Sequence, residues 1–323
     1  MVETMLPLLK EMEASKQIDI VFFQGEGTAF SAGADIKAIA NMTTYPSGRK
    51  ELEHLVDIYF KMTYAIGTMK VPFITFMDGL TATHFVYSSQ LPYIKQSLID
   101  LDNPSYKTIC EVIERYSVKP DHIPTSYTLH GERRKIIDSC FQFDTVSEIL
   151  EALQKDGSAF SLETIKQISR GSPISIALTL EQLRRGSMLS LAQCLIMENK
   201  SWKVGPFDSD FREGVYSTMG KEQAPRWSRT NNSDVDFKKD ILDRYINADI
   251  KQTLYFESDE REIYFNEPYR GRGLPTEEEV KKAKYESNLR TNEDVIACFV
   301  DLYNNKYGVR QEVEEILKKY HDL

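Results

Sequence analysis

The sequence predicts an α/β fold whose carboxy-terminal half is mostly helical. Dense apolar runs over 18–25 and 71–77 predict two buried strands, because each run has the length and composition of a core strand. Apolar residues three and four positions apart predict helices over 2–14, 34–42 and 50–68. Helix and strand therefore alternate up to about residue 81, whereas 82–228 carries mainly the helical pattern.

The helical part continues with four segments of clear three- and four-residue spacing. They lie at 91–98, 107–115, 133–141 and 146–155. Ser161 is expected to open a further helix, and Pro173 to stand in the first turn of the next one. A proline is tolerated there because its missing N–H would have had no helical partner. Ser172 then serves as the helix cap, which accounts for it better than a catalytic role does.

The character of the chain changes after about residue 229. The polar run 230–234 (TNNSD) indicates a boundary or a surface linker. Residues 264–275 (YFNEPYRGRGLP) have no periodicity, which fits either an arm on a partner or a strap on the chain's own domain. Thr276 and Glu279 form a predicted capping box ahead of helices at 277–288, 292–304 and 309–321. So small a module buries little alone and must dock on the main domain or on another protein.

The composition fits a globular protein with one sizeable core, since 41% of the 323 residues are hydrophobic and 28% are charged. The net charge of -9 argues against an extensive nucleic-acid surface, although protein contacts can still place the chain in a ribonucleoprotein. The dispersed cysteines and histidines predict reduced thiols and no metal site. No apolar run is long enough to cross a membrane, and no targeting peptide is recognisable at the amino terminus.

Residues 28–37 (TAFSAGADIK) follow the first predicted strand and include a small-residue turn. The stretch predicts a tight connection from strand to helix, where backbone N–H groups can face an anion or a carbonyl oxygen. A turn that only packs a helix on a strand would use the same small side chains. Alone, the stretch therefore indicates either half of an oxyanion site or a plain structural turn.

Together with downstream segments, this turn resembles the crotonase (enoyl-CoA hydratase/isomerase) superfamily. Residues 70–81 (KVPFITFMDGLT) resemble the family's second core strand and the turn after it. Segments 172–186, 210–215 (DFREGV) and 221–227 (KEQAPRW) resemble the 3-hydroxyisobutyryl-CoA hydrolase branch in the same order. The resemblance implies a truncated crotonase-like ββα-superhelix core with a helical carboxy-terminal region. The tail resembles extensions of fungal mitochondrial members of that branch.

The resemblance also implies a site. In the family, the N–H of the residue matching Ala34 polarises a CoA thioester carbonyl, which makes Ala34 the candidate catalytic residue through its backbone. The candidate substrate-binding residues are Gly33, Ala34, Asp35, Ile36 and Lys37, which would lie along the CoA chain. Coenzyme A enters as part of the substrate, so no separate cofactor is expected.

The chain departs from the family after Thr81. The family continues there with a glycine cluster and then with its catalytic carboxylates, whereas Ala82 begins a stretch that resembles family sequence several dozen residues later. Tyr59 stands where the hydrolases carry a glutamate, and a phenol cannot act as a carboxylate base at neutral pH. The chain also begins within a helix, after the family's CoA-adenine loop. The Thr81–Ala82 junction is a true deletion, a splicing product or a place where residues were omitted.

Two functions from different classes follow from this resemblance. The first is 3-hydroxyisobutyryl-CoA hydrolysis in valine breakdown, catalytically impaired in this chain unless the missing segment exists in a longer protein. The second is a non-catalytic subunit of the mitochondrial small ribosomal subunit, since fungal mitoribosomes recruited a member of this branch. The predicted domains are a partial crotonase core (1–81), its helical part (82–228) and an extension (229–323). We expect a mitochondrial matrix protein with an acyl-CoA ligand if active, protein partners bound through 264–323 and a possible homo-oligomer.

Overall fold

The computed structural model describes residues 1–27, 30–31, 33–76, 84–118, 131–220, 224–256, 273–286, 289, 291–303, 306 and 308–320. These residues group into two compact units. The first comprises Met1–Ser15, Ala32–Lys70 and Glu132–Glu267. The second comprises Lys16–Ser31, Val71–Gly131 and Pro268–Leu323.

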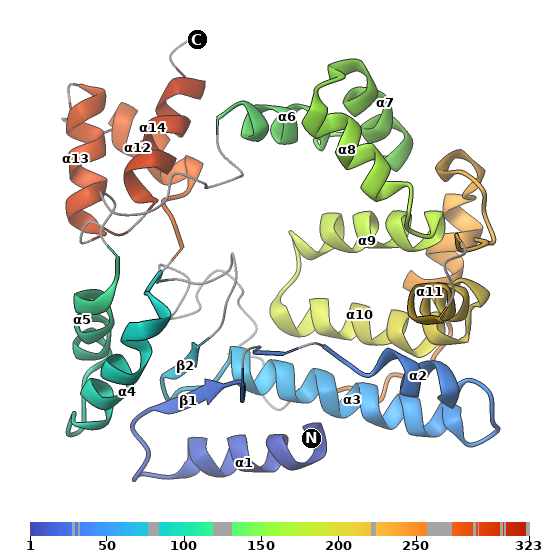
Figure 1. Ribbon diagram of the computed structural model, residues 1–323, viewed down its shortest axis with the longest axis horizontal. Helices are drawn as coiled ribbons and strands as arrows, with labels where there is room; N and C mark the ends of the chain where they lie inside the picture. The colour runs from blue at the N-terminus through green and yellow to red at the C-terminus, as the bar shows by residue number, and fades with distance from the viewer. Residues whose placement is uncertain are drawn as a thin grey trace. The chain divides into compact units, whose positions relative to one another are not determined.

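Helices build the described part of the first unit. They are α1 (Val2–Ala14), α2 (Ile36–Met42), α3 (Gly48–Gly67), α6 (Glu132–Cys140), α7 (Val146–Asp156), α8 (Ala159–Ile168), α9 (Pro173–Gly186), α10 (Leu191–Val204), α11 (Ser209–Gly220) and a π-helix, η5 (Phe237–Ile246). Two short 3₁₀ turns, η3 (Gly205–Phe207) and η4 (Asn232–Asp234), join them. Helix α3 lies between α1 and α10, and α9 packs against the other side of α10 (Figure 1).

The core of the first unit forms on one face of α3. Leu52, Val56, Phe60 and Tyr64 recur every four residues and are all buried. This spacing places side chains on a single helix face, which here packs against Leu195 of α10 in one cluster. The 20-residue length of α3 lets that face run along much of the unit.

Helix α8 begins slightly earlier than the sequence predicts. Ser158 is its cap, and the Ser158 hydroxyl accepts a hydrogen bond from the Ser161 N–H at 3.2 Å. Ser161 instead lies in the first turn, buried, where its hydroxyl donates to the Asp156 carboxylate at 2.6 Å. The prediction that Ser161 opens the helix is wrong because two serines three residues apart offer the same capping chemistry.

The predicted cap of α9 is confirmed. The Ser172 hydroxyl accepts from the Ser175 N–H at 3.3 Å, and Pro173 is the first residue of the helix. The cap of α7 is a capping box in which Thr145 and Glu148 each bond the other's backbone N–H. These caps satisfy N–H groups that have no partner within a helix.

The second unit contains a two-stranded sheet and two groups of helices. Its elements are β1 (Val21–Gln24), β2 (Phe73–Phe76), η1 (Ser88–Gln90), α4 (Leu91–Ile99), α5 (Tyr106–Tyr116), α12 (Glu277–Glu286), α13 (Asn292–Leu302) and α14 (Val309–Lys319). Both predicted strands are confirmed, and they pair in parallel with Val21 opposite Phe73. Phe22 and Phe76 stack at 5.9 Å and pack against the buried residues of α4 and α5.

The last three helices share a core of their own. Val280 of α12, Val295 of α13 and Val313 of α14 belong to one buried cluster. The predicted capping box at the start of α12 is confirmed, with the Glu279 carboxylate accepting from the Thr276 N–H at 2.7 Å. The sequence placed these three helices within two residues of their ends in the structure.

The described residues bear on some of the predictions made from the sequence and leave others outside their range. Among the described residues, no helix is both long and apolar enough to span a bilayer, and no group of metal-ligating side chains comes together. The strap 264–275 falls largely outside the described residues, as do the Thr81–Ala82 junction and three of the five histidines. The predicted domains 1–81, 82–228 and 229–323 were drawn from the family resemblance, and this division stays a prediction.

Candidate functional site

The turn that the sequence predicts as half of an oxyanion site lies at the start of α2. Gly33 has φ +86, a left-handed conformation that favours glycine, and an added Cβ would meet nothing within 4 Å. Ala34 is exposed, and no described residue accepts a hydrogen bond from its N–H. The backbone of Ala34 is therefore available to a ligand oxygen, as the predicted role requires.

The other predicted site residues lie on the same turn. Asp35 caps α2, with its Oδ1 accepting from the Ala38 N–H at 2.9 Å, so its carboxylate already has a structural role. Ile36 is half-buried and Lys37 is exposed. The roles of Gly33–Lys37 in binding an acyl-CoA stay a prediction. The turn after the second strand, which is expected to face them, lies outside the described residues.

Tyr59 lies on α3 with 46% of its surface exposed. Its ring packs edge to face on Phe60, with 5.4 Å between the centroids, while Phe60 points into the core. Position 59 is thus accessible from solvent and carries a phenol in place of a carboxylate. A carboxylate-dependent reaction has no base at this position.

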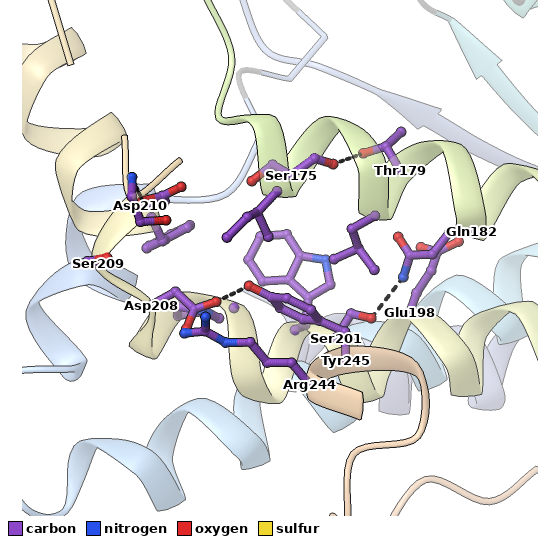
Figure 2. Close-up of a pocket in the computed structure, with 17 residues that line it drawn as sticks. Ser175, Thr179, Gln182, Glu198, Ser201, Asp208, Ser209, Asp210, Arg244 and Tyr245 are labelled. Carbon is purple, nitrogen blue, oxygen red and sulfur yellow. Dashed lines mark hydrogen bonds and ion pairs between the residues drawn. The ribbon is translucent and has the colours of Figure 1, made fainter. Parts of the chain in front are cut away.

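A second site, which the sequence did not reveal, is a cavity of about 230 Å³ inside the first unit. Helices α9, α10 and α11 and the π-helix η5 line it. Figure 2 shows Asp208, Ser209 and Asp210 at one end, with Gln182, Glu198 and Ser201 at the other. The cavity thus contains two separate polar groups.

The first polar group surrounds Asp208. Its carboxylate accepts hydrogen bonds from the Tyr245 hydroxyl and from the Arg244 guanidinium. Burial, followed by the negative charge of Asp210, raises the pKa of Asp208 to about 7. Arg244 opposes this rise but is only partly buried, so water weakens its field at the carboxylate.

Asp210 is held by neutral donors. The Ser172 hydroxyl donates to it at 2.6 Å, and the Ser228 N–H donates at 2.8 Å. Ser172 therefore has two structural bonds, as the cap of α9 and as a donor to Asp210. Asp210 belongs to the DFREGV segment, which the sequence analysis noted only for its resemblance, and nothing in the sequence marked this residue as buried.

The second polar group contains Glu198, whose carboxylate differs from those of Asp208 and Asp210 in its lack of hydrogen bonds from the described part of the chain. Glu198 lines the cavity from α10 and is half-buried, yet no described residue bonds to or forms an ion pair with its carboxylate. Burial raises the pKa of Glu198. Gln182 donates instead to the Ser201 hydroxyl at 2.9 Å.

A buried ion pair lies elsewhere in the first unit. Lys203 of α10 is 2% exposed, and its ammonium is 2.6 Å from Asp57 of α3 and 2.6 Å from the Thr253 hydroxyl. Asn199 donates to the same carboxylate at 2.9 Å, and Thr253 donates to it as well. The network fixes the segment that carries Leu254, whose side chain is fully buried in the main core.

Comparison with known proteins identifies the origin of this architecture. A model of the family Enoyl-CoA hydratase/isomerase matches residues 1–81 and 81–245. The chain belongs to this family. The two matched stretches meet at residue 81, where the sequence predicted that a segment of the family is missing.

Curated relatives place this enoyl-CoA hydratase/isomerase family member near two kinds of protein. The mitochondrial 3-hydroxyisobutyryl-CoA hydrolase of Mus musculus is 26% identical, covering 78% of this chain and 82% of the relative. The human protein of that name is also 26% identical, over 73% of this chain and 79% of its own length. Small ribosomal subunit protein mS47 of Neurospora crassa is 24% identical, covering 99% of this chain and 80% of the relative.

Solved structures confirm the crotonase-type fold of this family member. A carnitinyl-CoA dehydratase from Mycobacterium thermoresistibile superposes with a TM-score of 0.69 at 20% identity, covering 80% of this chain and 91% of that one. An enoyl-CoA hydratase from Rhodobacter sphaeroides 2.4.1 gives a TM-score of 0.63 at 18% identity, covering 76% and 89%. At these identities the similarity concerns the fold alone.

Proposed function

We propose that this chain is a hydrolase-like protein that has lost efficient thioester hydrolysis and serves as a structural subunit of the mitochondrial small ribosomal subunit, in the matrix. The extent of the similarity supports this proposal. The family model ends at residue 245, whereas the alignment to mS47 takes in 99% of the chain and so includes nearly all of 246–323. The carboxy-terminal extension thus has its counterpart in a ribosomal protein.

The interruption at residue 81 supports the loss of catalysis. The alignment to mS47 spans 410 positions although this chain has 323 residues, so that relative carries residues that are lacking here. In the family, the second oxyanion donor and the catalytic carboxylates belong to the segment after this point. Loss of one oxyanion donor alone lowers a rate about 100-fold to 1000-fold, and here the acid and base are expected to be lost with it.

The carboxy-terminal helices are suited to protein contacts. The cluster around Val280, Val295 and Val313 gives α12–α14 a core of their own. Tyr285 and Leu302 nevertheless remain 64% and 69% exposed. Tyrosine is enriched among the residues that contribute most to protein–protein binding, so Tyr285 is available for such a contact.

A second candidate function is weak hydrolysis of 3-hydroxyisobutyryl-CoA. The observation that favours it is the exposed Ala34 N–H, which no described residue uses. An unbonded amide at this turn is what one half of the proposed oxyanion site would need. Without a facing donor and a base, this amide gives little rate acceleration.

Two measurements test the proposal. Epitope-tagged chain should co-sediment with the mitochondrial small ribosomal subunit through a sucrose gradient, and a variant ending at residue 272 should not. Purified chain should release no free thiol from 3-hydroxyisobutyryl-CoA at a concentration where the mouse hydrolase gives rapid release. Rapid turnover by the purified chain, or tagged chain that stays at the top of the gradient, would reject the structural role.

A further inference from the structure

Glu198 occupies one end of the cavity without a counter-charge. Arg244, which also lines the cavity, pairs with Asp208, and Lys203 of the same helix as Glu198 pairs with Asp57. Figure 2 shows Glu198 at the opposite end of the cavity from Asp208. A half-buried carboxylate in this position has lost hydration without gaining a protein partner.

The cavity has room for an organic group beside this carboxylate. Its volume of about 230 Å³ far exceeds the space of about 10–15 Å³ that holds one water molecule. Ile174, Leu178 and Trp202 contribute apolar wall, and Trp202 is 36% exposed, so the site can be entered from solvent. A planar cation gains from contact with an indole ring, and an alkyl stem gains from aliphatic walls.

The charge of the lining favours a cationic ligand. Three carboxylates line the cavity, from Glu198, Asp208 and Asp210, against the single guanidinium of Arg244. Arg244 pairs with Asp208, and the hydrogen bonds that Asp210 accepts from described residues come from the neutral Ser172 hydroxyl and the Ser228 N–H. An anion would therefore be repelled, and a neutral ligand would leave Glu198 without a partner.

We propose that this cavity binds a guanidinium group carried on an apolar stem, with Glu198 as the ion-pair partner and Trp202 as part of the wall around it. The group is either the side chain of an arginine in another protein or a free alkylguanidine, because both present the same chemistry. The proposal is independent of the ribosomal role, since it depends only on residues of the first unit.

Titration calorimetry with n-butylguanidine and its neutral analogue n-butylurea tests the proposal on the full chain. The two probes have nearly the same shape, so their difference reports charge. We expect n-butylguanidine to bind at least tenfold more tightly than n-butylurea. Glu198→Gln should weaken n-butylguanidine about tenfold to a hundredfold, the effect of losing a charge-assisted hydrogen bond.

The matched control is Glu151→Gln, which makes the same change at an exposed position of α7 in the same unit. Its affinity for n-butylguanidine should equal that of the unmodified chain. Glu198→Gln should also raise the melting temperature of the unliganded chain, because it removes a half-buried charge without a partner. A residue with a purely structural bond would lower it instead.

Equal affinity for the two probes, no binding of n-butylguanidine at millimolar concentration, or unchanged affinity in Glu198→Gln would overturn the proposal. The comparison of the two probes on the unmodified chain remains decisive if the variant fails to fold. Acetyl-Gly-Arg-Gly-amide separates the two sources. Binding like n-butylguanidine assigns the site to an arginine side chain, and exclusion of the peptide while n-butylguanidine binds assigns it to a free small cation.

Discussion

Replacing Lys203 with methionine should lower the free energy of unfolding by about 3 kcal/mol. Lys203 is 2% exposed, and its ammonium lies 2.6 Å from the Asp57 carboxylate and 2.6 Å from the Thr253 hydroxyl. Removing one member of a buried ion pair costs roughly 3–5 kcal/mol, because the other charge stays buried without its partner. The lower end applies since Asp57 keeps its bond from Asn199 and its side chain is 15% exposed.

Urea denaturation followed by far-ultraviolet circular dichroism measures this change. Lys200→Met, a matched change at a partly exposed position of the same helix, should stay within about 0.5 kcal/mol of the unmodified chain. Limited proteolysis should cut near Thr253 more readily in the Lys203 variant, since its hydroxyl loses the ammonium. A loss of less than about 1 kcal/mol at Lys203 would show that the pair is solvated, contrary to its burial.

The same pair gives a pH dependence with a defined sign. Burial alone would raise the pKa of Asp57, but hydrogen bonds from Lys203, Thr253 and Asn199 outweigh it and hold that pKa below its usual 3.8. A lowered folded-state pKa stabilises the fold above the unfolded value, and this contribution disappears as the pH falls through the lower folded value. Asp57→Asn should therefore weaken the loss of stability on acidification below about pH 4.

Three further predictions concern single positions. Because the pKa of Asp208 is raised to about 7, its contribution to stability should decrease as the pH rises from about 4 to 7, and Asp208→Asn should flatten urea midpoints over that range. Gly157→Ala should cost about 1 kcal/mol in thermal melts, since Gly157 has φ +64, and a cost near zero would contradict that conformation. Val313→Ala should cost about 2 kcal/mol, and hydrogen exchange should detect the loss within α12–α14 rather than α3.

Local patterns predicted the elements because each depends on near neighbours in the sequence. The helix predicted over 50–68 is α3, and in the structure the four-residue spacing of Leu52, Val56 and Phe60 defines its buried face. The cap at Ser172 and the box at Thr276 likewise use side chains within three residues of the N–H groups they satisfy. The choice between equivalent acceptors at the start of α8 was beyond such patterns, and the sequence did not predict α10, α11 or the π-helix η5 as separate elements.

The charged clusters were not predictable in the same way. Lys203 and Asp57 belong to separate helices, and a lysine on a helix is ordinarily solvent-exposed, so nothing in its neighbourhood marks it as buried. In the sequence, Glu198 looks like an ordinary surface glutamate on a helix. Glu198 becomes a candidate binding residue only because α9 and η5 complete a cavity around it, and these helices come together only in the folded unit.

The features described above divide between the two units of the chain. The break at residue 81 falls in the segment Val71–Gly131 of the second unit, whereas the α3 core, the Lys203 ion pair and the cavity belong to the first. Each unit buries its own apolar clusters, and the described members of the cluster around Leu52 all belong to the first unit. We therefore expect the stability of the first unit to be separable from thioester chemistry, so that the loss of catalysis proposed above would leave the core of this unit intact.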